Sequence, residues 1–367
     1  MLTGPVILAA GGTGGHLFPA EALGRALIAQ GASVHLVTDS RADAFAAAVP
    51  GADVSQVRAG RLGGNPLHAA CGLAEMALGI VQARRLLRRL APRAVVGFGG
   101  YPSVPTMLAA AQLGYPTAIH EQNAVLGRAN RMLAPRARLI ATGFPETAGL
   151  RPADAARAVR TGNPVRPAIH DAATSFAPPE PGKPVAVLVL GGSQGARIFS
   201  EIVPPALAAL APELRARLRL SQQARPEDRA EVVARYQALG IDAKIECFFA
   251  DVPERLAAAQ LVICRAGAST IAELAASGRP ALLVPYPFAA DDHQSANARA
   301  FAASGGGWAM PQDALDAPAL ASRLGELLSD PAALATAAAA ARGFARDDAA
   351  DALAALVLGA VRMERAA

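Results

Sequence analysis

The chain has 367 residues, of which 52% are hydrophobic and only 18% are charged, and its net charge is +5. At about 150 residues per domain this length predicts two domains, and high hydrophobicity with a small net charge excludes an intrinsically disordered chain. The mild positive charge favours anionic partners, but it is too small for a protein that coats nucleic acid.

Two parts of the chain repeat one pattern, in which a glycine-rich turn joins an apolar strand to a helix. In the first part, the apolar run 5–10 leads into the glycines of 11–15, a helical segment of about 18–30 and a strand at 33–37. In the second, the strand 184–190 leads into Gly191-Gly-Ser-Gln-Gly195 and another helical segment. Strands that alternate with helices predict a doubly wound parallel sheet, and two copies predict two Rossmann-like α/β domains.

A turn-rich stretch around 162–182 separates the two patterns. We therefore expect an N-terminal domain at 1–163 and a C-terminal domain at 164–343. The last helical segment, about 344–367, has no strand after it, and we expect it to pack back on the first domain.

Neither a membrane span nor a secretion signal is predicted. The stretch 94–119 carries no charge and exceeds the ~20 residues of a spanning helix. Prolines at 102, 105 and 116 interrupt it, so it is predicted as strand, glycine loop, helix, turn and strand. The first ten residues lack a basic region and the three cysteines lack metal spacing. These features predict a cytoplasmic protein.

A glycine-rich turn between a parallel strand and a helix exposes backbone N–H groups beside a positive helix end, which suits phosphate. One such turn can serve tight packing alone, whereas two facing each other across a domain cleft are a stronger signal. A nicotinamide dehydrogenase is a rival interpretation, because Asp39 follows the second strand where a ribose-binding acid would lie. However, Leu17 stands in place of the third glycine of GxGxxG.

The second half contains a further strand–turn–helix unit at 262–273. Thr270 and Glu273 have capping-box spacing, which favours a helix N-cap; alternatively, Ser269 and Thr270 bind a phosphate there and Glu273 binds a ribose diol. The polar cluster 291–297 then suits either a sugar or a solvated helix start. Asp-x-Asp is absent and the histidines lack ligand spacing, so no metal site is predicted.

The first half adds two segments at strand ends, where open α/β sheets bind ligands. One is the glycine turn 97–103, with Ser103 as a candidate helix cap, and the other is His120-Glu-Gln-Asn123 after the strand 117–119. His16, at the end of the first glycine loop, is expected to point into the same crevice.

Together these motifs resemble the MurG family, transferases that add N-acetylglucosamine to undecaprenyl-pyrophosphoryl-N-acetylmuramoyl-pentapeptide (lipid I) to give lipid II. The resemblance implies a GT-B fold, with two Rossmann-like domains and an interdomain cleft, and an inverting transfer from UDP-N-acetylglucosamine (UDP-GlcNAc) without metal or other cofactor. The matching motifs are GGTGGHLFPA at 11–20, GFGGYPS at 97–103, HEQN at 120–123, TGNPVR at 161–166, GGSQGAR at 191–197, CRAGASTIAE at 264–273 and DDHQSANA at 291–298.

The resemblance also implies roles for single residues. His16 is the first candidate for the general base and Glu121 the second. The backbone of Phe249 would meet the uracil and Glu273 the ribose. The remaining donor-binding positions, for the diphosphate and the sugar, are Thr13, Gly14, Gly15, Asn123, Arg166, Ser193, Gln194, Ala268, Ser269, Thr270, Gln294 and Asn297. The acceptor pyrophosphate would lie near the glycines of 14–15 or 99–100.

A lipid-linked acceptor requires a membrane contact, and the helical segment 71–90 is our candidate. An apolar face is followed by arginines, which favours an anionic membrane surface; an ordinary core-facing helix is the alternative. The apolar residues are Leu73, Met76, Ala77, Ile80, Ala83 and Leu87, and the arginines are Arg84, Arg85, Arg88 and Arg89. We expect a peripheral protein at the cytoplasmic face of the inner membrane, with cell-wall assembly proteins as possible partners.

Three other functions remain open at this point. Another GT-B transferase that acts on a glycolipid such as diacylglycerol is the nearest. A UDP-sugar 2-epimerase shares the fold but needs no lipid-facing surface. A non-catalytic UDP-sugar-binding protein would need no base beside the sugar site, and the intact HEQN and DDHQ segments argue against it.

Overall fold

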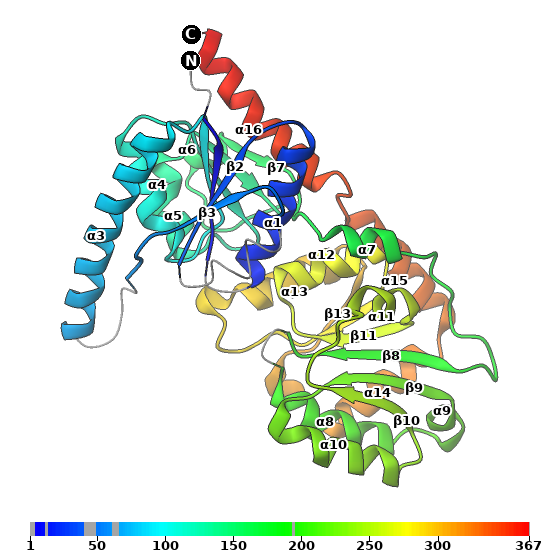
Figure 1. Ribbon diagram of the computed structural model, residues 1–367. Coiled ribbons are helices and arrows are strands. Elements are labelled where there is room, and N and C mark those ends of the chain that lie inside the picture. Colours follow the sequence, from blue (N-terminus) through cyan, green and yellow to red (C-terminus); the bar gives the residue numbers. More distant parts are fainter. Residues whose placement is uncertain (1–3, 12–13, 40–48, 61–65, 193–194, 367) are drawn as a thin grey trace. The chain divides into compact units, whose positions relative to one another are not determined.

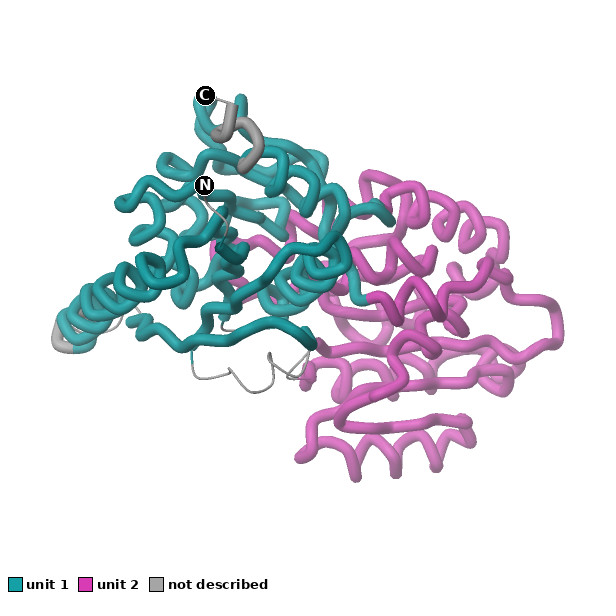
Figure 2. Tube along the Cα trace, turned by 45° about the horizontal axis from the view of Figure 1, so that its top comes forward, with its two compact units in different colours: residues 1–166, 346–367 teal, residues 167–345 magenta. Residues whose placement is uncertain are grey.

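A computed structural model describes residues 4–11, 14–39, 49–60, 66–192 and 195–366 (Figure 1). The chain forms two compact units, the first comprising Met1–Arg166 with Arg346–Ala367 and the second Pro167–Ala345 (Figure 2). Each unit contains one sheet whose strands all pair in parallel, with helices on its faces. The predicted fold class, two doubly wound α/β domains, is therefore confirmed.

The sheet of unit 1 has seven strands in the order β3-β2-β1-β4-β5-β6-β7. The strands are β1 (Val6–Ala9), β2 (Val34–Thr38), β3 (Asp53–Gln56), β4 (Ala94–Gly97), β5 (Thr117–Glu121), β6 (Leu139–Thr142) and β7 (Ala158–Arg160). The helices are α1 (Gly14–Ala29), α3 (Pro66–Leu90), α4 (Ser103–Gln112), α5 (Arg128–Leu133), α6 (Pro152–Ala155) and α16 (Ala349–Ala366).

Strand β1 shows why the central strands are continuously apolar. All four of its residues are buried, and the two sides of the strand supply two different cores. Val6 and Leu8 join a cluster with α1 and α16, whereas Ile7 joins a cluster with α3 and α4. Figure 1 shows these helix pairs on opposite faces of the sheet. A strand covered on both sides needs side chains that avoid water on both sides.

The C-terminal helix α16 packs on α1 and belongs to unit 1. Its Leu353, Ala354 and Val357 are buried in the same cluster as β1. It begins at Ala349 and not near residue 344 as predicted. Phe344 is instead the last residue of a separate helix, α15 (Pro331–Phe344).

Helix α3 exposes only part of the face predicted to meet a membrane. Met76, Ala83 and Leu87 are buried in the core of unit 1, so the prediction is wrong for these three residues. Leu73, which belongs to the predicted face, is 58% exposed, and Leu78 and Val81, which were not predicted, are 50% and 47% exposed. The predicted stripe and the exposed one lie side by side on the helix, and packing against the core selects which is covered.

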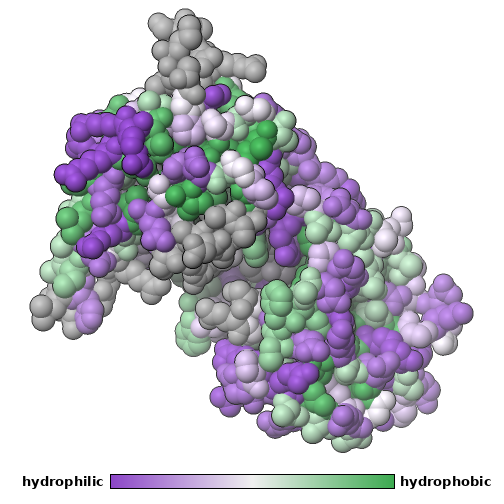
Figure 3. All heavy atoms as spheres, in the orientation of Figure 1, coloured by the Kyte–Doolittle hydropathy of each residue, from purple (hydrophilic) through white to green (hydrophobic). Residues whose placement is uncertain are grey.

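The exposed stripe of α3 changes character along its length. Ala74, Leu78, Val81, Arg85 and Arg88 are exposed and follow one another at intervals of four and three residues, which places them on one helix face. The face is therefore apolar over its first half and basic over its last turns. Figure 3 shows green surface on the outer side of α3 and purple surface gathered at its upper, C-terminal end. Among the described residues, no helix has the length and hydropathy of a membrane span.

The sheet of unit 2 has six strands in the order β10-β9-β8-β11-β12-β13. The strands are β8 (Val185–Leu190), β9 (Leu218–Gln223), β10 (Asp242–Glu246), β11 (Leu261–Cys264), β12 (Ala281–Leu283) and β13 (Gly307–Ala309). The helices are α7 (Pro167–Ala172), α8 (Arg197–Ala208), α9 (Pro212–Arg217), α10 (Pro226–Ala238), α11 (Val252–Ala258), α12 (Ala268–Ser277), α13 (His293–Ala303), α14 (Ala317–Leu328) and α15.

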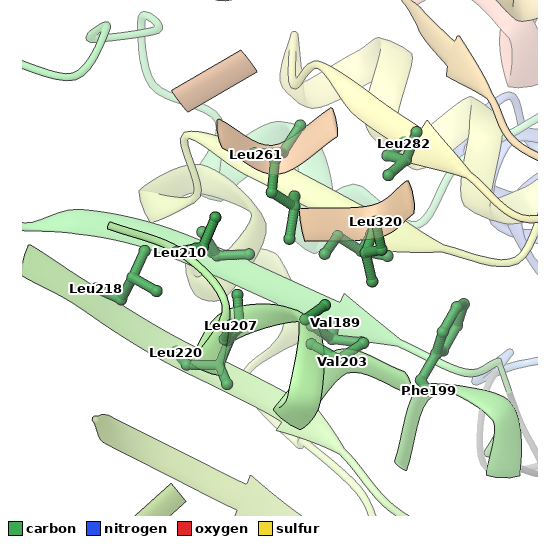
Figure 4. Packing of buried hydrophobic residues seen from close by; sticks show 14 of the residues in the cluster. Val189, Phe199, Val203, Leu207, Leu210, Leu218, Leu220, Leu261, Leu282 and Leu320 are labelled. Atoms are coloured by element: carbon green, nitrogen blue, oxygen red, sulfur yellow. The ribbon is translucent and has the colours of Figure 1, made fainter. Parts of the chain in front are cut away.

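The core of unit 2 lies between its sheet and the helices α8, α10 and α14. Val189 of β8 packs with Phe199, Val203 and Leu207 of α8 and with Leu320 of α14 (Figure 4). Side chains from strand and helix interdigitate at full burial, which fixes the end of β8.

Candidate active site

Both sheets reverse their winding at their first strand, and this determines where a site can form. In unit 1, β1 lies between β2 and β4, and in unit 2, β8 lies between β9 and β11. The connections leaving such neighbouring strands run in opposite directions, which leaves a crevice at their carboxyl ends. The motifs at 11–20 and 97–103 follow β1 and β4, and those at 191–197 and 264–273 follow β8 and β11.

Helix α1 was predicted to begin near Phe18, but it begins at Gly14. His16 therefore lies in its first turn. Its imidazole is half-buried and packs on the glycine turn after β4. Gly99 and Gly100 have φ of +85° and +71°, and a Cβ there would lie 3.4 and 3.3 Å from the His16 ring. Glycine is required at these two positions for both reasons, backbone conformation and close approach to the imidazole.

The His16 ring is joined to the end of β5 through Gln122. The Nδ1 atom of His16 is 3.1 Å from Oε1 of Gln122, and Nε2 of Gln122 is 3.0 Å from Nδ1 of His120. Nε2 of His120 is 3.0 Å from the carbonyl oxygen of Gly162. His120 is completely buried, and burial lowers its pKa to about 4. The side chain is therefore neutral at pH 7.

Glu121 is only 2% exposed, and its carboxylate is surrounded by donors. The backbone and side-chain nitrogens of Asn123 donate to Oε1 at 3.0 and 3.1 Å. The backbone of Gly127 and Nδ2 of Asn130 each donate to Oε2 at 2.9 Å. Four hydrogen bonds hold the carboxyl group in place and fix the loop that carries Asn123.

Sequence reasoning missed Gln122 and Asn130 as members of this network. Gln122 is part of the HEQN motif at 120–123, but no role was predicted for it. Asn130 lies in α5 and belongs to none of the motifs. Ser103 is also not the cap that was predicted: it is the first residue of α4, and its hydroxyl donates to the carbonyl of Gly100.

Arg166, the last residue of unit 1, lies with its guanidinium 4.9 Å from the centre of the Phe18 ring. Phe18 also packs near Gly14 in the first turn of α1. The cation is thus held beside the helix start that carries Gly14, Gly15 and His16. Thr13 lies outside the described residues, as do Ser193 and Gln194 in unit 2.

In unit 2, the start of α12 is uncovered by any side-chain cap. The helix begins at Ala268 after Gly267, and Gly267 provides no side-chain hydrogen bond. Thr270 is therefore already inside the first turn, so the capping-box interpretation of Thr270 and Glu273 is wrong. The Oγ atom of Ser269 is buried and has no hydrogen-bond partner. This helix end combines backbone N–H groups that have no partner within the helix with a hydroxyl that has none, which is a suitable arrangement for an oxyanion.

The polar cluster after β12 is held by internal hydrogen bonds. Asn297 of α13 is fully buried, and its Nδ2 donates 3.1 Å to the carbonyl of Ala266, in the turn that precedes α12. Oε1 of Gln294 accepts from the backbone nitrogen of Tyr286 at 2.9 Å. Glu273 is half-buried on α12. These contacts bring the 285–297 segment and the α12 start into one cluster of unit 2.

Phe249 lies in the loop after β10 with its side chain in the core, 4% exposed. The guanidinium of Arg255 stacks 4.2 Å from the centre of its ring, and Arg255 is itself held by Asp251 and Ser221. The neighbouring Phe248 is 78% exposed. A buried side chain fixes the backbone at Phe249, the part of this residue to which sequence reasoning assigned binding.

Comparisons with known proteins identify the family. Residues 6–142 match the glycosyltransferase family 28 N-terminal domain, and residues 186–353 match its C-terminal domain. A relative from Rhodospirillum centenum is 58% identical over 98% of this chain and 95% of its own length, and one from Paramagnetospirillum magneticum is 54% identical over 99% and 98%. Both are named UDP-N-acetylglucosamine--N-acetylmuramyl-(pentapeptide) pyrophosphoryl-undecaprenol N-acetylglucosamine transferase.

Solved structures agree with this result. MurG of Acinetobacter baumannii aligns with a TM-score of 0.78 at 30% identity, covering 97% of this chain and 99% of that one. The calicheamicin glycosyltransferase CalG4, at 17% identity and a TM-score of 0.65, shares the fold alone. The chain is a glycosyltransferase of family 28 and belongs, within it, to the MurG family of N-acetylglucosamine transferases.

Proposed function

We propose that this enzyme transfers N-acetylglucosamine from UDP-GlcNAc to the 4-hydroxyl of the N-acetylmuramoyl unit of lipid I, giving lipid II for peptidoglycan synthesis. The observation that carries the proposal is the 58% identity, over 98% of the chain, to a relative named for this transfer. Each sheet has a crevice at the carboxyl ends of its central strands, β1 and β4 in unit 1 and β8 and β11 in unit 2. These two positions agree with a donor site in one unit and an acceptor site in the other.

Unit 2 holds the donor. The diphosphate lies at the start of α12, where the N–H groups and the Ser269 hydroxyl supply hydrogen bonds, and Glu273 accepts from the ribose hydroxyls. Gln294 and Asn297 contact the sugar, and the backbone at Phe249 contacts the uracil. As the bond from the anomeric carbon to the β-phosphate oxygen breaks, UDP gains negative charge, which the start of α12 stabilises.

Unit 1 holds the acceptor and the base. The acceptor hydroxyl is a weak nucleophile and loses its proton as its oxygen bonds to the anomeric carbon; His16 takes that proton. Glu121 is less suited to this role, because four N–H groups already use its lone pairs. Its contacts support a positioning role, with the carboxylate fixing Asn123 for sugar contact. The acceptor pyrophosphate lies at the glycines of 14–15 or 99–100.

The exposed face of α3 is the membrane contact in this proposal. Leu78 and Val81 would enter the lipid interface, while Arg85 and Arg88 meet anionic headgroups at about 1 kcal/mol for each basic residue. The enzyme would thus sit peripherally on the cytoplasmic face of the inner membrane, where its lipid-linked acceptor is held. Cell-wall assembly proteins are its candidate protein partners.

Incubation of the purified chain with UDP-GlcNAc and a short-chain lipid I analogue tests the proposal. The expected result is acceptor-dependent UDP release together with a disaccharide-bearing lipid product, detected by mass spectrometry. Parallel reactions with diacylglycerol, and with UDP-GlcNAc alone, separate a different glycolipid acceptor or 2-epimerisation from the proposed transfer. UDP release without product, or no reaction with the lipid I analogue, would reject it.

A further inference from the structure

We propose that Gln122 and His120 are positioning residues that hold His16 in the tautomer with its proton on Nδ1, so that the lone pair of Nε2 is left to accept a proton. The tautomer is a property of the free protein, and only its use in catalysis rests on the proposed function. The inference follows from the order of donors and acceptors along one chain of hydrogen bonds, which runs from the carbonyl of Gly162 to the His16 ring.

The chain of hydrogen bonds begins at a group that can only accept. The carbonyl oxygen of Gly162 is 3.0 Å from Nε2 of His120, so this nitrogen must carry a proton. Gly162 has φ of +84°, which fixes the carbonyl in a backbone conformation that favours glycine. A neutral His120 with its proton on Nε2 has an unprotonated Nδ1, and that atom can only accept.

The amide of Gln122 has one orientation that satisfies its surroundings. Its Nε2 is 3.0 Å from both Nδ1 and the carbonyl oxygen of His120, and both of these atoms are acceptors. The two amide protons serve the two acceptors. Rotating the amide by 180° would instead bring its carbonyl oxygen against them and leave three acceptors facing one another. The oxygen Oε1 must therefore point to His16.

The last hydrogen bond then determines the His16 tautomer. Oε1 of Gln122 can only accept, and it is 3.1 Å from Nδ1 of His16, so Nδ1 carries the proton. In the neutral imidazole the other nitrogen, Nε2, is left with its lone pair. The two left-handed glycines, Gly99 and Gly100, pack on the ring and restrict its rotation out of this arrangement.

The network matters because an imidazole in water prefers the opposite tautomer, with its proton on Nε2. In that form Nε2 cannot accept a proton from a substrate. A base confined by its surroundings must therefore also be held in the correct tautomer, and the partner of its second nitrogen does this. Neither Gln122 nor His120 needs to touch substrate to act in this way.

Nitrogen NMR of the full chain labelled with ¹⁵N-histidine tests the proposal without substrate. The chain has six histidines, and loss of one signal set in His16→Gln assigns His16. In the unaltered protein we expect protonated Nδ1 and unprotonated Nε2 at His16. In Gln122→Leu we expect the Nε2-protonated form to dominate. A proton on Nε2 in the unaltered protein, or the same tautomer in both proteins, would overturn the proposal.

Kinetics provide the second measurement. Gln122→Leu should lower kcat by ~10-fold or more, as part of the ~10²–10⁴ that a positioned base provides, with KM for UDP-GlcNAc nearly unchanged. Gln122→Glu keeps an acceptor for the Nδ1 proton of His16 but turns a second oxygen toward the two acceptors of His120, so it should retain the proton on Nδ1 of His16 at a cost in folding stability. An unchanged kcat in folded Gln122→Leu, or loss of the proton on Nδ1 of His16 in folded Gln122→Glu, would contradict the proposed role.

A matched control is Gln222→Leu, which removes another fully buried amide, bonded to Tyr236 in unit 2. It should leave the His16 tautomer unchanged. If the unaltered protein has the expected tautomer but transfers no sugar, the proposed function fails and the network stands. If it transfers sugar with the opposite tautomer, the network fails and the proposed function stands.

Discussion

The edges of the two sheets have the same topology but present different chemistry. At the switch point of unit 1, side chains bond to one another: His16, Gln122 and His120 form one chain, and Glu121 accepts four N–H groups beside it. At that of unit 2, the start of α12 has no side-chain cap and the Ser269 hydroxyl has no partner. The first edge is suited to holding an imidazole in place, and the second is suited to receiving an anion.

The largest effect is expected at the imidazole. His16→Ala should lower turnover by about 10²–10⁴-fold, because it removes the proposed base, while affinity for UDP-GlcNAc remains close to that of the unaltered enzyme. Steady-state kinetics with calorimetric binding of the donor would separate the two quantities. Near-normal turnover would remove His16 from this role.

Substitution of Glu121 tests whether the edge of unit 1 contributes to folding stability as well as to the reaction. Glu121→Leu leaves several buried donors unpaired, and we expect a loss of roughly 3 kcal/mol in the free energy of unfolding. The measurement is urea unfolding followed by circular dichroism. Glu121→Gln should lose less stability and keep substantial turnover. Full stability in Glu121→Gln with turnover as low as in His16→Ala would instead identify Glu121 as the base.

The buried His120 makes the stability of this edge depend on pH. Because burial lowers its pKa from 6.5 to about 4, an unfolded chain binds a proton in this interval that the folded chain does not. Stability should therefore fall as the pH drops from about 6.5 to about 4, by up to ~3 kcal/mol at the lower end. His120→Gln should show a shallower decline in unfolding free energy over that range. An identical slope in the two proteins would contradict the prediction.

The exposed face of α3 belongs to unit 1 but to neither sheet edge, and its predicted property is binding to a membrane. Arg85→Glu with Arg88→Glu should weaken binding to anionic vesicles by at least ~30-fold, since each arginine contributes about 1 kcal/mol. Co-sedimentation with vesicles of phosphatidylglycerol measures it. The matched control reverses two exposed arginines of unit 2, Arg219 and Arg229. Equal binding by both variants would exclude α3 as the contact.

The smallest effect is expected at the edge of unit 2, where several backbone N–H groups would bind the donor diphosphate together with the Ser269 hydroxyl. Ser269→Ala removes one hydroxyl and should raise KM for UDP-GlcNAc by ~5- to 10-fold, with little change in the stability of the free protein. Ser277→Ala is the control, because that hydroxyl lies on the same helix and bonds to the carbonyl of Glu273. A KM unaffected by Ser269→Ala would separate this hydroxyl from the donor.

Much of the fold and the position of each edge followed from sequence, because glycine-rich turns mark the carboxyl ends of buried strands. The side-chain contacts at these edges could not be predicted from the sequence. Nothing in the sequence marks the amide of Gln122 as a link between two histidines, and Asn130 reaches Glu121 only through the packing of α5. The start of α12 was misjudged because Gly267 permits the helix to begin before Thr270.

The α3 error has a different physical origin. A helix rich in alanine and leucine carries apolar residues on more than one side, so periodicity alone identifies a helix without choosing its inward face. Only the position of Met76 and Leu87 beneath α4 and β1 decides that Leu78 and Val81 are outside.

The return of α16 to unit 1 has a consequence for synthesis of the chain. Unit 2 is an uninterrupted segment inserted into unit 1, whose core lacks Leu353, Ala354 and Val357 until the residues after 345 are made. During translation, therefore, all residues of the second unit are synthesised before the helix that completes the core of the first. The unit whose strands are made earlier can complete its core only after the other unit has been synthesised.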